Sequence, residues 1–179
     1  RRRHTRLRRD WSSDVCSSDL TQCSLDEEVL QKKHIELNFE GLDTYGNVFL
    51  NDSLILKSNN AFRQSKVDVK SILKAENELR IVLKSTTKFE EREKAKLLYE
   101  LPEGNRIFTR KAQFQYGWDW APKLNTSGIW KGVYLKAWDD LKIKDVFIKQ
   151  LELGNSEAKL EVDIKSFLDA GISKQLSYN

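Results

Sequence analysis

The sequence predicts an all-β fold, a sandwich or jelly roll built from short strands. Two observations support this prediction. Apolar and polar residues alternate over many short segments, which is the period-2 pattern of half-buried strands. Turn-forming residues separate these segments, and only one stretch has convincing helical character. This succession favours two packed β layers over an alternating α/β architecture.

The predicted strands follow one another along the first 140 residues. Ile35, Leu37 and Phe39 alternate with polar neighbours and define the first clear strand. The turn at Asn51-Asp52-Ser53 joins the next two apolar segments and predicts a hairpin. Further strands are expected at residues 66–73, 78–86 and 128–138, and residues 110–116 are expected to be extended.

One stretch, Phe89 to Glu100, predicts a helix. Glu90 and Lys94 form a favourable i,i+4 pair, and apolar side chains recur on one face at helical spacing. Pro102 and Gly104 end the pattern. Residues 25–33 read either as a short helix or as the end of a strand with its turn.

The strand pattern restarts after Asp139-Asp140, which predicts a domain boundary near residue 140. Residues 141–179 contain two more strand segments joined by Gly154-Asn155-Ser156. These are too few strands to close a second sandwich. We therefore expect a domain at 21–140 and the truncated beginning of another at 141–179.

Composition excludes several functional classes. The 179 residues are 39% hydrophobic and 32% charged, with no apolar run that approaches a membrane span. Six arginines and three aspartates within residues 1–20 hold most of the net charge of +4. Residues 21–179 are close to neutral, with interleaved signs, so no basic patch predicts nucleic-acid binding.

Residues 1–20 (RRRHTRLRRDWSSDVCSSDL) show neither helical nor strand periodicity. They resemble the translation of a sequencing adaptor, and we expect them to be non-native. The alternative is a basic arm that binds nucleic acid or membranes. Without Cys16, Cys23 is the only cysteine, and no Cys/His cluster has metal-ligand spacing.

An aromatic cluster lies in the segment FQYGWDWAPKLNTSGIW. Trp118 and Trp120 flank Asp119, and Gly117 and Pro122 give the loop a non-regular geometry. Aromatic rings suit the apolar faces of a pyranoside, and a carboxylate can accept hydrogen bonds from two hydroxyls. The alternative is that both tryptophans pack in the core while Asp119 caps a turn, and composition alone favours it.

The sequence offers no candidate catalytic residue. No nucleophile elbow, Ser/His/Asp set or glycine-rich phosphate loop is present. The carboxylates Glu90, Glu91 and Glu93 lie on a charged helix face, which predicts that they are solvated.

Three blocks carry a resemblance to a known family: HIELNFEGLDTYGNVFLND, SNNAFRQSKVDVKSIL and RKAQFQYGWDWAPKLNTSGIWKGVYLKAW. Together they resemble the N-terminal domain of β-mannosidases of glycoside hydrolase family 2, over about residues 21–165. The block from Arg110 to Trp138 is the most specific. The FEGLDTY block is shared with β-galactosidase- and β-glucuronidase-like relatives.

The resemblance implies a galactose-binding-like jelly roll at 21–140, truncated at its N-terminus, and the start of an immunoglobulin-like sandwich from 141. A (β/α)₈ barrel of ~250 residues would follow and supply both catalytic glutamates, so it lies outside this chain. With the family's opening strands replaced by residues 1–20, we expect an unpaired sheet edge.

The resemblance also implies a function, that of a retaining exo-β-mannosidase fragment without catalytic residues. Trp118 and Trp120 would form an apolar wall, Asp119 would bind hydroxyls, and Asn60 would approach the same site. The expected partner is a β-mannoside or manno-oligosaccharide, with no cofactor, metal, nucleic acid or membrane. Two alternatives stay open: a stand-alone carbohydrate-binding module, and another family 2 glycosidase. Periplasmic, secreted and lysosomal locations all fit the family.

Overall fold

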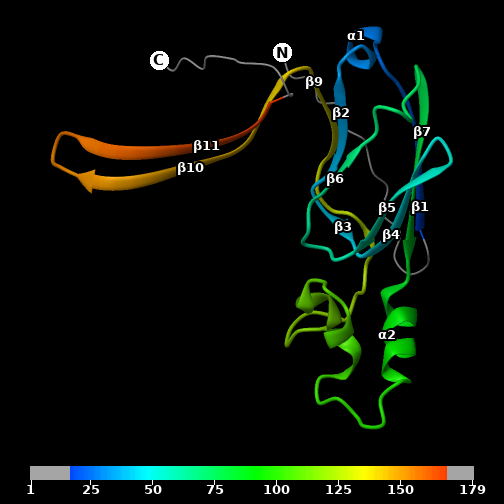
Figure 1. The fold of residues 1–179 in the computed structure, drawn as a ribbon. Helices are drawn as coiled ribbons and strands as arrows, with labels where there is room; N and C mark the ends of the chain where they lie inside the picture. The colour runs from blue at the N-terminus through cyan, green and yellow to red at the C-terminus, as the bar shows by residue number, and fades with distance from the viewer. Residues whose placement is uncertain (1–16, 169–179) are drawn as a thin grey trace.

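A computed structural model describes residues 17–168, and it confirms the all-β prediction (Figure 1). Antiparallel strands build a four-stranded sheet, ordered β1-β7-β4-β5, and a three-stranded sheet, ordered β6-β2-β9. Buried apolar side chains of both sheets form one core, to which β2, β4, β7 and β9 all contribute. The core therefore lies between two β layers, as in a sandwich.

The four-stranded sheet has clear sequence causes. Its strands are β1 (Ser17–Ser24), β7 (Glu76–Lys84), β4 (Tyr45–Leu50) and β5 (Ser53–Asn59). Every second residue of β7 is buried, so its alternating pattern points one face into the core. The predicted hairpin between β4 and β5 is confirmed, and Asn51 and Asp52 adopt the positive φ angles of 48° and 65° that its tight turn needs.

The second layer consists of β6 (Ser65–Asp68), β2 (His34–Phe39) and β9 (Val133–Trp138). The first predicted strand is thus confirmed at the centre of this sheet, where β2 pairs with both neighbours. A short pair, β3 (Leu42–Asp43) with β8 (Gly128–Ile129), extends from the end of β2. Through this pair, the long loop before β8 returns to the sandwich.

The N-terminal strand corrects one expectation. β1 pairs with β7 along eight residues, from Ser17 opposite Leu83 to Ser24 opposite Glu76. β7 therefore has a partner on both sides, so the N-terminal segment supplies a strand where we expected a missing one to leave an unpaired edge. Residues 1–16 lie outside the described residues. Because strand pairing uses the backbone, it does not report on the origin of Ser17–Leu20, and a non-native segment 1–20 stays a prediction.

Within residues 17–168, four short helices interrupt the strands. They are α1 (Glu27–Leu30), α2 (Thr86–Lys94), and the 3₁₀ helices η1 (Gly104–Phe108) and η2 (Gln113–Tyr116). The expected extended segment at 110–116 was wrong, because η2 occupies its second half. α2 begins before the predicted start, since the Ser85 side chain accepts a hydrogen bond from the Lys88 backbone N–H.

The predicted pair between Glu90 and Lys94 was also wrong. Lys94 Nζ lies 3.0 Å from Glu100 Oε2, beyond the end of α2. Glu90 is buried and accepts a hydrogen bond from the Tyr116 hydroxyl, so the prediction that it is solvated fails. Tertiary contact with η2 turns Glu90 inward, and burial together with this hydrogen bond raises the pKa of Tyr116 above its ordinary value.

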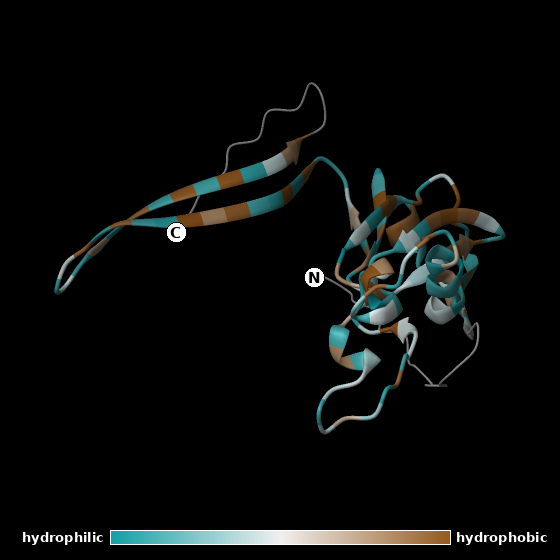
Figure 2. Ribbon diagram, turned by 90° about the horizontal axis from the view of Figure 1, so that it is seen from below, coloured by the Kyte–Doolittle hydropathy of each residue, from teal (hydrophilic) through white to brown (hydrophobic). Residues whose placement is uncertain are grey.

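Beyond residue 140 the chain forms a long hairpin of β10 (Leu141–Leu153) and β11 (Ala158–Leu168), which projects from the sandwich (Figure 1). Apolar and polar residues alternate along both strands (Figure 2). Paired residues such as Val146 with Ile164 and Ile148 with Val162 line one face and are about half exposed. The restart after residue 140 is therefore real, while the immunoglobulin-like identity of this segment stays a prediction.

Two asparagines fasten the β4–β5 turn to the start of β7. The buried Asn77 side chain accepts hydrogen bonds from Lys74 N and Asn51 Nδ2, both at 2.9 Å, and donates one to Lys74 O at 2.7 Å. Asn51 also accepts a hydrogen bond from the Glu78 backbone N–H at 2.9 Å. The side chains of Asn51 and Asn77 thus hydrogen-bond to backbone groups at the start of β7 and in the segment that precedes it.

Replacing Asn77 with alanine tests this amide pair. Asn77→Ala should lower the free energy of unfolding by ~2–4 kcal/mol, because several buried polar groups lose their partners. Urea denaturation of the protein measures the change. Asn59→Ala, at an exposed strand end, is the control and should stay within ~0.5 kcal/mol of wild type. Equal effects of the two substitutions would rule out the role assigned to Asn77.

The contact between Tyr116 and Glu90 predicts a pH dependence. Because the folded pKa of Tyr116 is raised, its contribution to stability is present below the unfolded value near 10 and is lost as pH rises above it. Tyr116→Phe should reduce stability by ~1–3 kcal/mol at pH 8, since Glu90 loses its donor. It should also make the decline above pH 10 shallower.

Denaturation curves at intervals between pH 8 and pH 11.5 measure both effects. Tyr99→Phe is the matched control, because the Tyr99 ring is exposed, and its stability at pH 8 should equal that of wild type within ~0.5 kcal/mol. Parallel declines of wild type and Tyr116→Phe above pH 10 would contradict the prediction.

Candidate functional site

The predicted sugar-binding residues form the tip of a tight turn. Trp118 N donates to Ala121 O at 3.3 Å and Ala121 N donates to Trp118 O at 3.2 Å, which places Asp119 and Trp120 at the two central positions. The Trp118 side chain is 58% exposed and the Trp120 side chain is 85% exposed. Packing of these tryptophans in the jelly-roll core, the alternative that composition favoured, is therefore wrong.

The chain around this turn has a defined geometry. Gly117 has a φ of +105°, a conformation that side chains rarely adopt, and it directs the chain from η2 into the turn. Leu124 N donates to Gln115 O at 3.0 Å and joins the two limbs behind the turn. These backbone contacts present Trp118, Asp119 and Trp120 as one unit on the surface.

Asn60 lies in a different loop and has a different environment. Its side chain accepts a hydrogen bond from Phe62 N at 2.9 Å, and its backbone forms a bridge with Arg110. The next residue, Ala61, accepts a hydrogen bond from Trp130 Nε1 at 2.8 Å. The contacts of Asn60 thus tie it to the base of the long loop, and no hydrogen bond among residues 17–168 links it to the Trp118–Ala121 turn.

A buried ion pair that the sequence did not reveal lies where the loop meets β3. Lys111 Nζ is 2.7 Å from Asp43 Oδ2, and both side chains are shielded from solvent. The ammonium also donates to Thr126 O, and the Thr44 hydroxyl donates to Asp43 Oδ1. Burial lowers the pKa of Lys111, while the hydrogen bond and charge of Asp43 oppose that effect and favour the cation.

Gln115 links this ion pair to the loop. Its Nε2 donates to Asp43 Oδ2 at 3.2 Å, and its Oε1 accepts a hydrogen bond from the Thr126 hydroxyl at 3.4 Å. Asp43 and Lys111 lie 68 positions apart, so no local spacing pairs them. Asp43 and Lys111 each belong to one of the blocks that carry the family resemblance, and this was the one sign in the sequence that they matter. Neither residue differs in sequence from the many surface charges.

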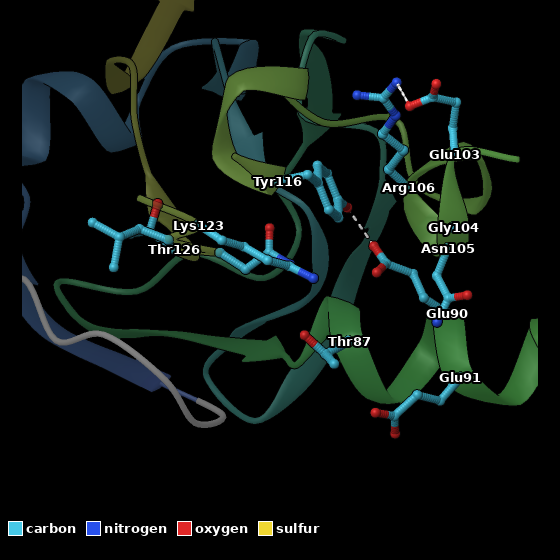
Figure 3. A pocket seen from close by; sticks show the side chains of 12 residues that line it. Thr87, Glu90, Glu91, Glu103, Gly104, Asn105, Arg106, Tyr116, Lys123 and Thr126 are labelled. Carbon is cyan, nitrogen blue, oxygen red and sulfur yellow. Dashed lines mark hydrogen bonds and ion pairs between the residues drawn. The ribbon is translucent and has the colours of Figure 1, made fainter. Parts of the chain in front are cut away.

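A hollow of about 650 Å³ lies between α2 and the loop limbs (Figure 3). Its walls include Glu90, Tyr116, Arg106 and Lys123, and the Tyr116 hydroxyl points toward the Glu90 carboxylate. Trp118, Asp119, Trp120 and Asn60 do not line it. The hollow therefore flanks the predicted site without forming part of it.

The described side chains support binding chemistry. Exposed indole rings offer apolar faces, and Asp119 between them offers a carboxylate acceptor, which is the combination that pyranoside recognition needs. Residues 17–168 contain no group of His, Cys, Asp and Glu side chains arranged to hold a metal ion. Within the same residues, none of the helices has the length and apolar character needed to span a membrane.

Comparison with known proteins agrees with the fold. The family described as glycosyl hydrolase 2 galactose-binding domain-like matches residues 10–131. β-Mannosidase B of Aspergillus flavus is 37% identical over 147 residues, which are 78% of this chain and 17% of that protein. The β-mannosidase of Mus musculus is 28% identical over 167 residues, covering 84% of this chain and 19% of the relative.

Solved structures give the same result. The β-D-mannosidase from Dictyoglomus thermophilum superposes with a TM-score of 0.77 at 35% identity, over 84% of this chain and 19% of that one. A β-D-glucuronidase of the same organism has a TM-score of 0.57 at 19% identity, over 85% of this chain and 25% of its own, and shares the fold alone. This chain spans less than a fifth of the length of the β-mannosidases described above. Since the family match covers more than half of the sequence, the chain belongs to the galactose-binding-like domain family of glycoside hydrolase family 2.

Proposed function

We propose that this chain is the substrate-contacting jelly-roll region of a retaining exo-β-mannosidase, which removes terminal β-D-mannose residues. The observation that carries the proposal is the exposed Trp118-Asp119-Trp120 turn, in a chain that is 35% identical to a solved β-D-mannosidase. Exposure of two indole rings to water is unfavourable unless a ligand or another surface covers them. A pyranoside at the mouth of a catalytic domain would provide that cover.

Each residue has a distinct role in this proposal. Trp118 and Trp120 contact the apolar C–H faces of the terminal mannosyl unit, and Asp119 accepts hydrogen bonds from its hydroxyls. Asn60 approaches the same site from the neighbouring loop. Its amide oxygen is already engaged by Phe62 N, so the Asn60 contribution is smaller than that of Asp119.

The reaction itself belongs to a (β/α)₈ barrel joined to this chain in the same protein. There, one glutamate acts as acid/base and a second as nucleophile, and hydrolysis proceeds with retention through a glycosyl-enzyme intermediate. The hairpin β10–β11 begins an immunoglobulin-like sandwich between the two. The apolar face of the hairpin, which is exposed among the described residues, supports this placement because a sheet with one apolar face needs a second layer.

Substitution of Asp119 tests the proposed role. In the full-length enzyme, Asp119→Ala should remove ~2–4 kcal/mol of transition-state stabilisation, because charge-assisted hydrogen bonds to substrate hydroxyls are lost. This corresponds to a decrease in kcat/KM on an aryl β-mannoside of roughly 30- to 1,000-fold. Asp119→Asn keeps an acceptor and the turn, so its loss should be smaller. Steady-state kinetics measure both variants.

Asp52→Asn is the matched control for Asp119→Asn, since Asp52 is also exposed at the tip of a tight turn. Its kcat/KM should equal that of wild type. A loss below a few-fold for Asp119→Ala would mean that the aspartate has only a structural role. Comparing aryl β-mannoside with aryl β-galactoside and aryl β-glucuronide identifies the substrate class, and a preference for either of the latter two would refute the mannosidase proposal.

A further inference from the structure

The long loop that carries the Trp118–Ala121 turn has an unusual lack of apolar anchoring. Between Lys111 and Val133, none of the 21 residues is fully buried, and Ile129, at the returning end, packs against the core. Hydrophobic packing therefore fixes the returning end and does little for the part of the loop before β8. A binding loop needs a defined position, so its polar contacts with the sandwich become decisive.

Those polar contacts converge on one carboxylate oxygen. Asp43 Oδ2 accepts hydrogen bonds from Lys111 Nζ at 2.7 Å and from Gln115 Nε2 at 3.2 Å. Gln115 belongs to the outgoing limb of the loop, immediately before the turn. Thr126 belongs to the returning limb, and it contacts both Gln115 Oε1 and the Lys111 ammonium. Both limbs are thus held at the same point.

The carboxylate that accepts these hydrogen bonds belongs to a paired strand of the sandwich. Asp43 belongs to β3, its backbone pairs with Gly128 of β8, and its side chain is buried. From Gln115, one further hydrogen bond joins the two limbs, because its carbonyl oxygen accepts the Leu124 N–H at 3.0 Å. Tyr116 and Gly117 then connect Gln115 to Trp118 through the backbone. Hydrogen bonds therefore reach from the sandwich to the base of the turn, and two residues of backbone cover the last step.

We propose that Asp43, Lys111 and Gln115 are positioning residues that set the location of Asp119 and its flanking tryptophans for substrate binding. This inference rests on the proposed function. Lys111 and Asp43 form the fixed base, and Gln115 transmits its position to the turn. None of the three touches the substrate.

Gln115 is the residue to change, because Lys111→Met would leave the buried Asp43 carboxylate without a cation and endanger the fold. Gln115→Met keeps the length of the side chain and removes both of its polar contacts. In the full-length enzyme it should lower kcat/KM on an aryl β-mannoside about tenfold to a hundredfold, through misplacement of the loop. The midpoint of thermal unfolding should stay close to that of wild type.

Gln113→Met is the matched control. Gln113 lies in the same 3₁₀ helix, and its Nε2 donates to the Lys111 carbonyl at 3.1 Å, without contact to Asp43 or Thr126. It should retain wild-type kcat/KM. Hydrogen exchange provides a second readout: Gln115→Met, unlike Gln113→Met, should speed exchange of the Trp118, Ala121 and Leu124 amides.

A double-mutant cycle tests whether Gln115 acts through Asp119. In the Asp119→Ala background, Gln115→Met should cost much less than it does in wild type, because the contact that it positions is already gone. Full additivity of the two losses would overturn the inference. Unchanged exchange and unchanged kcat/KM in Gln115→Met would overturn it as well, even where Asp119→Ala still impairs the enzyme.

The two proposals fail in different ways. Faster exchange in Gln115→Met without a kinetic loss, together with a fully active Asp119→Ala, would refute the sugar-binding role of the turn and with it the inference. If Asp119→Ala lowers kcat/KM but Gln115→Met changes neither kcat/KM nor amide exchange, only the positioning role is refuted.

Discussion

The position of the candidate site depends on one buried ion pair, Asp43 with Lys111. A charged pair inside a protein contributes little net stability, because desolvation offsets most of the attraction, but loss of one partner leaves an uncompensated charge. Its value here is geometric. An ammonium that contacts a carboxylate on β3 and a carbonyl on the returning limb restricts where the intervening loop can go.

This constraint explains how exposed tryptophans can still form a specific surface. A loop whose aromatic residues packed into the core would be rigid but would have no rings left to contact a ligand. Here the rings of Trp118 and Trp120 face solvent while polar contacts at the loop base provide the rigidity. A second contact, from Tyr116 to Glu90, fastens the same loop to α2 from the other direction.

The sandwich supplies the frame for both contacts. Its core joins the two sheets, and β3 pairs with β8 at the returning end of the loop. The hairpin β10–β11 leaves the frame at residue 141, with an apolar face that suits a second β layer. In the proposed enzyme, this region would orient the terminal sugar, and a separate barrel would perform the hydrolysis.

The sequence by itself determined the all-β class, the hairpin at Asn51-Asp52, the renewed strand pattern after residue 140 and the position of the aromatic loop, since each depends on local alternation, turn residues or a contiguous motif. Only the tertiary structure decided that Trp118 and Trp120 are exposed, that Glu90 is buried, and that Asp43, Lys111 and Gln115 meet. The physical reason is that burial and long-range pairing depend on which segments the fold brings together. A lysine 68 positions from its carboxylate looks like any surface charge until both strands and the loop are in place.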